Sequence, residues 1–218
     1  MSWRRPTGKT WTLFLLLACM GSAPAWVWRD RIEFEFGYAY AQGNFHGVSL
    51  PRDDARAAYW LRLAASDNHP RAQYMLGLLY AHGWGVKQDN ALAQRWFNLA
   101  ARHHYAQAAF HLAWMYHKGD GVAPDRQRAL RLMQQAAGQG MAEAQLALGR
   151  FYEQGEGVAT DTVRAMQWYR LAADTARKHP ERFDNARVAA RADAARDRLA
   201  LQLAQHGAPA GTAVPPAN

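Results

Sequence analysis

Cysteine is almost absent from this sequence of 218 residues, in which Cys19 is the only one. No disulfide can join two parts of the chain, so a folded core must be held together by packing. Serine is scarce as well, because only Ser49 and Ser66 occur after residue 25, and few nucleophiles are therefore available for catalysis. Long apolar runs are also missing. The run from Trp11 to Met20 has ten residues, too few to span a bilayer.

A leader is predicted at the start of the chain, where three kinds of segment follow one another. Residues 1–9 are basic, residues 11–20 are apolar, and residues 21–25 are small and end in Ala-x-Ala. This order is typical of a secretory signal and predicts a leader of residues 1–25 that is cleaved after Ala25. We therefore expect an exported, periplasmic chain.

Two alternatives for the leader stay open. Leu16-Leu17-Ala18-Cys19 resembles a bacterial lipobox, in which case Cys19 carries a lipid and the chain is an outer-membrane lipoprotein. In the other alternative the leader is not cleaved and forms an anchor that extends through Trp28. Contact with a membrane is expected only through one of these two attachments.

The positive charge of the chain does not indicate a nucleic-acid partner. The formal net charge is +8, and three of the basic residues, Arg4, Arg5 and Lys9, lie in the leader. The remaining basic residues are scattered along the sequence. We therefore expect no binding to nucleic acid.

A repeat of thirty-six residues organises the rest of the sequence. Gly-x-Gly-Val occurs three times at that spacing, beginning at Gly83, Gly119 and Gly155, and an Asp follows three residues after each Val. An Ala-Ala pair recurs four times at the same spacing. The first copy departs from the register because four extra residues lie in its loop, between Asn44 and Arg52. A fixed period of this length is typical of a stacked array.

Each repeat is predicted to hold two helices. The first has apolar residues at i, i+4, i+5 and i+8, as in the segment from Ala72 to Tyr80. The second begins after the repeated Asp (Asp89, Asp125 and Asp161), which suits an N-cap. Its buried stripe includes Trp168 and Tyr169. No strand pattern competes with this reading.

The loops are predicted to depend on residues that tolerate positive φ. The first Gly of Gly-x-Gly-Val is expected to end the first helix in a left-handed conformation, and the second Gly to permit the turn back. Asn68, His104 and Gly140 share a register in the loops between repeats, and each tolerates positive φ better than most residues. The Gly-x-Gly-Val loop lacks the Gly-Lys-Ser/Thr of a phosphate-binding loop.

The full pattern, Ala-x3-Leu-Gly-x2-Tyr-x2-Gly-x-Gly-Val-x2-Asp-x3-Ala-x2-Trp-x3-Ala-Ala, resembles the Sel1-like repeat, a relative of the tetratricopeptide repeat with a longer loop between its helices. The resemblance covers roughly residues 26–177 in four copies. It implies an all-α fold, a right-handed superhelical solenoid, and a scaffold that binds other proteins or peptides. The sequence departs from the secreted cysteine-rich subfamily, whose units are locked by disulfides.

The chain is divided accordingly. Within an array of residues 26–178, the repeats are expected at about 26–67, 68–103, 104–139 and 140–178. A capping helix is expected within residues 179–206, from Asp184 to about Gln205, because an array must cover its last face. Residues 207–218 are rich in Gly, Pro and Ala and are predicted to be a disordered tail. The candidate apolar side of the capping helix consists of Ala186, Ala189, Ala190, Ala194, Leu199 and Leu203.

A binding groove is expected on the concave side of the first helices, by analogy with the tetratricopeptide repeat. Packing does not require the rings of Tyr38, Tyr74, Phe110 and Trp114, and aromatic residues with Arg nearby are typical of protein-binding hot spots. In the alternative, some of these side chains pack against the neighbouring repeat. The expected groove residues are Arg31, Phe34, Tyr38, Arg71, Tyr74, Leu78, Gln107, Phe110, Trp114, Glu143, Leu146 and Arg150.

We therefore expect a non-catalytic scaffold of the bacterial cell envelope that binds a peptide or a partner protein. The alternative is an envelope enzyme or glycan-binding accessory protein that acts on peptidoglycan, with Glu153 and Glu156 as a carboxylate pair. Ser66-Asp67-Asn68 echoes a penicillin-binding motif, but its Ser-x-x-Lys and Lys-Thr-Gly partners are missing after the leader. No cofactor or metal is expected, because His103, His104 and His111 do not form a recognised metal spacing.

Overall fold

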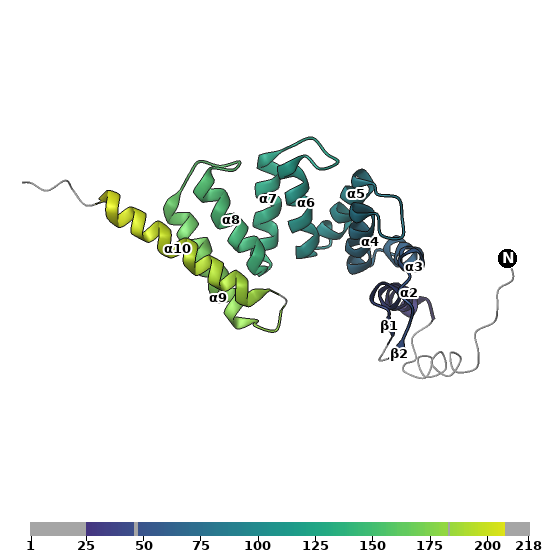
Figure 1. Cartoon of the computed structure of the whole chain (residues 1–218). Helices are drawn as coiled ribbons and strands as arrows, with labels where there is room; N and C mark the ends of the chain where they lie inside the picture. The colour runs from purple at the N-terminus through teal and green to yellow at the C-terminus, as the bar shows by residue number, and fades with distance from the viewer. Residues whose placement is uncertain (1–24, 46–47, 183, 208–218) are drawn as a thin grey trace, which may run out of the picture.

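The computed structural model describes residues 25–45, 48–182 and 184–207, which form a row of helix pairs followed by one long helix (Figure 1). Successive pairs pack against each other, and the predicted all-α solenoid is confirmed. The helices are α2 (Ala25–Gln42), α3 (Asp54–Ser66), α4 (Pro70–His82), α5 (Asn90–Arg102), α6 (Ala106–Lys118), α7 (Arg126–Gly138), α8 (Ala142–Gln154), α9 (Thr162–Lys178) and α10 (Asn185–Gly207).

A short β-hairpin interrupts the helical pattern in the first repeat. Strands β1 (Asn44–Phe45) and β2 (Val48–Ser49) are antiparallel, with Asn44 opposite Ser49. They lie in the loop that carries the four extra residues, so the expectation that no strand occurs is wrong there. Phe45 stacks on Phe36 of α2, with 5.5 Å between the ring centroids. This contact attaches the hairpin to the first helix pair.

Aspartate caps begin the second helix of every pair. The side chains of Asp53, Asp89, Asp125 and Asp161 each accept a hydrogen bond from the backbone N–H three residues later. Each bond satisfies a free amide of the first turn and places a carboxylate at the positive end of the helix. The three predicted caps are confirmed, and Asp53 is a fourth.

Residues with positive φ end the helices where the sequence predicts them. Gly83, Gly119 and Gly155 have φ of 71°, 82° and 75° and follow α4, α6 and α8. The turns between pairs also contain positive φ at all three expected positions, Asn68, His104 and Gly140. The predicted role of these residues is therefore confirmed.

The second glycine of each loop also lies against the preceding helix pair. A Cβ at Gly157 would be 2.5 Å from the carbonyl oxygen of Arg126, at the start of α7. A Cβ at Gly85 would be 2.1 Å from the carbonyl carbon of Asp54, at the start of α3. Only a residue without a Cβ can make this approach, so the second glycine fixes how neighbouring pairs stack as well as allowing the turn.

Inside the second and fourth pairs, a glycine on the first helix faces a large ring on the second. A Cβ at Gly77 would lie 2.6 Å from the ring of Phe97, and one at Gly149 would lie 2.6 Å from the ring of Tyr169. Both rings are buried. Trp168, which we expected to share this burial, is partly exposed. In these two pairs, the ring that fills the space between the helices therefore belongs to the residue after the tryptophan, because that residue faces the glycine.

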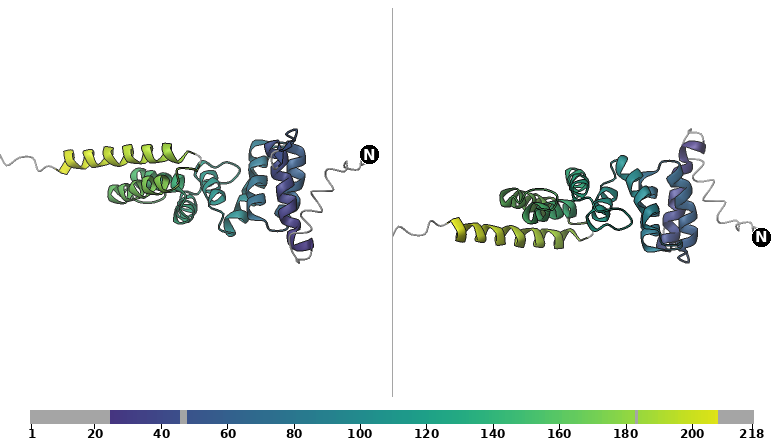
Figure 2. Two further views of the ribbon diagram at one scale, coloured as in Figure 1. Left: turned by 90° about the horizontal axis from the view of Figure 1, so that it is seen from below. Right: turned by 90° about the horizontal axis from the view of Figure 1, so that it is seen from above.

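Helix α10 lies along the α8–α9 end of the array (Figure 2) and contacts both of these helices. It begins at Asn185, one residue after the predicted start. Its buried apolar side chains are Val188, Ala189, Ala192 and Leu199. The prediction of Ala186, Ala190, Ala194 and Leu203 is wrong, since these are exposed. The prediction failed because alanines occur on every side of this helix, so that several of its faces are equally apolar in the sequence.

Several predictions concern residues outside the described part of the chain. The leader before Ala25, including Cys19, lies outside it, and so do residues 208–218 of the predicted tail. Among the residues that the structure describes, no helix is both long enough and apolar enough to cross a bilayer.

Gly157→Ala is expected to destabilise the fold more than Gly140→Ala. Both glycines have positive φ, 74° and 77°, so each substitution costs roughly 1–2 kcal/mol of backbone strain. A Cβ at Gly140 meets nothing within 4 Å, whereas at Gly157 it must displace the backbone of Arg126, which adds roughly 1–3 kcal/mol. Urea unfolding measures the difference. Equal losses would show that the loop does not fix the stacking of the pairs.

Tyr169→Ala is expected to lower the free energy of unfolding by roughly 3–5 kcal/mol, because a fully buried ring leaves a cavity beside Gly149. Trp168→Ala removes a larger ring, but one that is partly exposed, and should cost less. The two variants are compared by urea unfolding under the same conditions. A larger loss from Trp168→Ala would contradict the assignment of the core ring.

Candidate binding groove along helix α6

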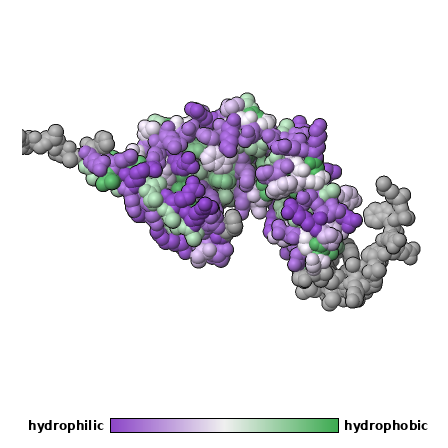
Figure 3. Space-filling model, in the orientation of Figure 1, coloured by the Kyte–Doolittle hydropathy of each residue, from purple (hydrophilic) through white to green (hydrophobic). Residues whose placement is uncertain are grey.

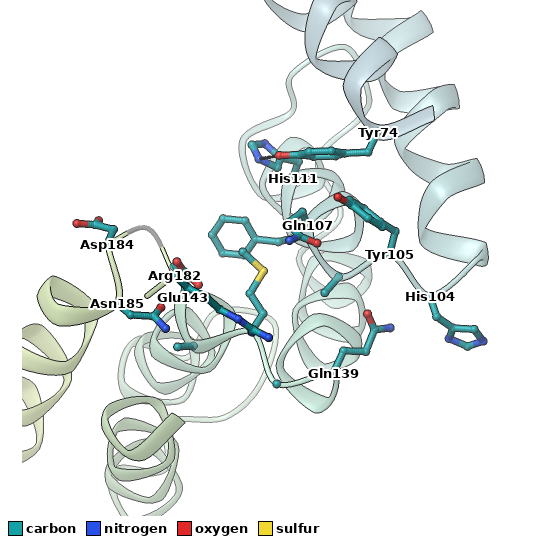
Figure 4. Close-up of a pocket in the computed structure, with 15 residues that line it drawn as sticks. Tyr74, His104, Tyr105, Gln107, His111, Gln139, Glu143, Arg182, Asp184 and Asn185 are labelled. Carbon is teal, nitrogen blue, oxygen red and sulfur yellow. Dashed lines mark hydrogen bonds between the residues drawn. The ribbon is translucent and has the colours of Figure 1, made fainter. Parts of the chain in front are cut away.

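A cleft of about 990 Å³ lies where three helices begin. The first turns of α6, α8 and α10 and the residues just before them form its walls, and Tyr74 of α4 borders it. In Figure 4, Tyr74 and His111 lie on one side of the cleft, and Asp184 and Asn185 lie across from them. We call this the larger cleft.

A second cleft, of about 500 Å³, lies further along α6. Leu78 of α4, Phe97 of α5 and Trp114 of α6 are among its lining residues. His111 lines both clefts, so they meet at this side chain and follow one side of α6. We call the two clefts together the α6 groove. The space-filling view shows that the lower edge of the array is hollowed between its α9–α10 end and its α2–α5 end (Figure 3).

Aromatic rings surround the point where the clefts meet. The Tyr74 hydroxyl and His111 Nε2 are 3.2 Å apart and share a hydrogen bond (Figure 4). The Tyr74 ring lies 5.1 Å from Tyr105, and the His111 ring stacks on Phe97 at 5.5 Å, both measured between centroids. Tyr74 thus packs against the neighbouring repeat, as the alternative interpretation of the aromatic positions expected.

Burial keeps the two polar groups of this cluster uncharged at neutral pH. It raises the pKa of Tyr74 to about 12, with Tyr105 as a second cause. Burial, with the nearby His82 as a second cause, lowers the pKa of His111 to about 4. The centre of the α6 groove is therefore neutral, aromatic and able to form hydrogen bonds.

The rim of the larger cleft carries both signs of charge and two amides. Glu143 and Asp184 are acidic, Arg182 is basic, and Gln107 and Gln139 offer carboxamide donors and acceptors. Neither sign dominates. The chemistry of this cleft therefore favours an occupant with apolar side chains and free backbone polar groups over a highly charged one.

The structure brings six of the predicted groove residues to the α6 groove. Tyr74, Gln107 and Phe110 line the larger cleft, as does Glu143, and Leu78 and Trp114 line the smaller one. Phe110 and Trp114 are edge-to-face, with centroids 6.1 Å apart. These residues come from the second, third and fourth repeats.

Phe34 and Tyr38 of the first repeat form, with Arg71 of the second repeat, a separate cluster that lines neither cleft. Phe34 stacks on His69 at 4.5 Å, and the Arg71 guanidinium lies 5.0 Å from the Phe34 ring and 4.9 Å from the Tyr38 ring. Phe34 is 4% exposed, which corrects the prediction that it is open to a partner. Arg31 and Arg71 are exposed at this end of the array.

The predicted residues late in the fourth repeat also lie outside the groove. Leu146 is 7% exposed and belongs to the core cluster that includes Val188 and Ala192 of α10, so its prediction as a binding residue is corrected. Arg150 is exposed and lines neither cleft.

Sequence reasoning missed several residues of the larger cleft. Tyr105 and Met141 precede α6 and α8 at equivalent positions, and the repeat pattern assigns them no role in binding. Tyr105 occupies the N-cap position of α6 but forms no side-chain cap bond. An aromatic residue in place of a usual N-cap residue was a signal of a binding role that could have been used. Arg182 and Asn185 lie beyond the repeat register, and nothing in the repeat pattern could have placed them here.

The two carboxylates considered for catalysis have separate structural partners. Glu153 accepts a hydrogen bond from the Tyr169 hydroxyl at 2.5 Å and pairs with Arg198 of α10. Glu156 lies 3.3 Å from Nε of Arg126 in the preceding repeat. Neither lines the α6 groove. In the described part of the chain, no three His, Cys, Asp or Glu side chains are grouped as a metal site would require.

Comparison with known proteins gives a family match over most of the array. The model of the Sel1 repeat matches residues 34–69, 70–105, 106–141 and 142–174. A Sel1 repeat protein from Oxalobacter formigenes has a solved structure that is 35% identical, with a TM-score of 0.64, and the match covers 74% of this chain and 64% of that one.

A second solved structure is c5321, described as a protective antigen present in uropathogenic Escherichia coli strains displaying an SLR fold. It is 33% identical, with a TM-score of 0.65, and the match covers 84% of this chain and 39% of that one. The present chain thus spans less than two thirds of the length of either protein. No curated protein matches the sequence.

Lowering the pH from 7 to 5 is expected to destabilise the fold partly through His111. In the unfolded chain a histidine takes up a proton near pH 6.5, whereas burial lowers the pKa of His111 to about 4. The unfolded state therefore binds more protons between these values, and stability falls as the pH falls. His111→Gln should flatten the pH dependence of the melting temperature more than its matched control, His103→Gln, which replaces an exposed histidine. Equal slopes for both variants would contradict this role.

Proposed function

The chain belongs to the Sel1 repeat family, and from this premise we propose that it is a non-catalytic scaffold that binds a peptide or partner protein in the α6 groove. Sel1 repeats generally mediate protein–protein interaction. We further propose that it acts in the bacterial cell envelope, as a periplasmic protein or an outer-membrane lipoprotein. The leader-like order of residues 1–25 supports this location.

The main support for this proposal is a set of aromatic rings that are partly exposed along one side of α6. Tyr105, Phe110 and Trp114 are only half-buried although the apolar core of the array is otherwise closely packed. Rings that present an apolar face beside hydrogen-bonding groups are the usual anchors of protein interfaces. The larger cleft, at about 990 Å³, has the size of sites that enclose a ligand.

Hydrolysis of peptidoglycan by Glu153 and Glu156, the alternative function, has less support from the geometry than binding in the groove. Glu153 and Glu156 are engaged with different partners, Tyr169 and Arg198 for the first and Arg126 for the second. A catalytic pair must share one substrate between its two carboxylates. Release of soluble fragments from peptidoglycan by the purified chain would contradict the scaffold proposal.

Gln107→Arg is expected to weaken the binding of groove ligands, and Gln127→Arg is its matched control. Both glutamines are exposed and both are the second residue of a 13-residue helix, but only Gln107 lines the larger cleft. Peptides selected from a displayed library on the unmodified chain are titrated into both variants. We expect at least tenfold weaker binding to Gln107→Arg, on the order of 1.4 kcal/mol or more, and unchanged binding to Gln127→Arg. Equal effects would show that the groove is not the binding site.

A further inference from the structure

The last residues of the sequence have a composition that fits the larger cleft. Residues 208–218 read Ala-Pro-Ala-Gly-Thr-Ala-Val-Pro-Pro-Ala-Asn, with three prolines, no charged side chain and no aromatic ring. Proline-rich segments favour the extended polyproline II conformation, which forms no internal hydrogen bonds and leaves its backbone carbonyls free. Such a segment loses little entropy on binding and is commonly held by aromatic grooves.

We propose that residues 208–218 of one copy of the chain bind in the larger cleft of a second copy, with Pro215 and Pro216 against its aromatic rings. This inference rests on the proposed function and names the occupant of the same groove. The chain thereby assembles with itself, because each copy offers one segment and one cleft.

The lining of the larger cleft complements this segment. Tyr74, Tyr105 and Phe110 provide ring surface for the proline rings, and Met141 adds an adaptable apolar side chain. The amide of Gln107 can donate to the free carbonyls of the bound segment. The mixed charge of the rim gives no advantage to an acidic or basic peptide, which agrees with a segment that lacks charged side chains.

The length of α10 disfavours binding of this segment to the cleft of its own chain. Asn185, the first residue of α10, lines the larger cleft, and the helix runs for 23 residues to Gly207, about 34 Å. The far end of α10 points away from α6 (Figures 1 and 2). The nine residues from Gly207 to Pro216 span at most about 32 Å when fully extended. The two adjacent prolines therefore fall short of their own cleft but can reach that of a neighbour.

The first experiment compares the full chain with a chain that ends at Gly207, which keeps all of α10. Sedimentation velocity at increasing concentration should show self-association of the full chain, and only monomers of the shortened one. A labelled peptide of residues 207–218 should bind the shortened chain, as measured by fluorescence anisotropy. A full chain that stays monomeric, together with a peptide that does not bind, would overturn the proposal.

Variants of the peptide and of the protein identify the residues that form the contact in each of them. Replacing Pro215 and Pro216 with Ala in the peptide should weaken its binding at least tenfold, whereas Pro209→Ala should have little effect. On the protein, Gln107→Arg should weaken binding at least tenfold and Gln127→Arg should not, with melting temperatures confirming that both variants are folded. Equal binding to both protein variants would place the segment elsewhere and overturn the proposal.

Two further outcomes separate this inference from the function on which it rests. If library peptides bind at Gln107 but the peptide of residues 207–218 does not, the self-assembly proposal fails and the scaffold function stands. If the labelled peptide binds the shortened chain but is excluded from a monomeric full chain, the segment occupies the cleft of its own chain, and assembly between copies is overturned.

Discussion

The backbone contact between each Gly-x-Gly-Val loop and the helix pair before it determines the geometry of the array. The second glycine of a loop lies against the residue that follows the capping aspartate of the preceding repeat: Gly85 against Asp54, Gly121 against Asn90, and Gly157 against Arg126. The two most regular parts of the motif, the glycine loop and the aspartate cap, therefore meet across the boundary between repeats. This explains why their spacing is strict, since a longer or shorter connection would separate the two partners.

Polar contacts at the ends of the second helices follow the same plan but use different side chains. The carbonyl groups of Ala65 and Ala137 each accept a hydrogen bond from a glutamine eight residues later, Gln73 and Gln145. At the corresponding position α6 has Ala109, and Gln135 of α7 reaches back to the carbonyl of Ala101 instead. Each of the three carbonyls also accepts a hydrogen bond from a backbone N–H of the following turn, so the glutamine adds a second bond at this position. The second bond recurs in these three repeats, while the residue that donates it changes.

The repeat period, the caps and the positive-φ turns could be predicted from the sequence because each depends on local chemistry that recurs at a fixed spacing. Asp89 caps α5 and Gly83 ends α4 through atoms of neighbouring residues. The candidate site could be predicted only in part. Tyr74, Phe110 and Trp114 were found because packing inside the repeat did not explain them. The burial of Leu146 could not be predicted, since it depends on tertiary packing in a core cluster that also includes residues of α10, a helix outside the repeat.

The two ends of the array explain why the groove lies in its middle. At the first end, Arg71 and His69 pack on the ring of Phe34, and at the other end Leu146 of the fourth repeat is buried in the core cluster that also includes residues of α10. The corresponding ring on α6, Phe110, has no such cover and borders the larger cleft. An array must cover its terminal faces to remain soluble, and here that cover also removes two of the four equivalent positions from any contact with a partner. The location of the groove is therefore a consequence of how the ends are closed, and a partner is directed to α6 because the rings there remain accessible.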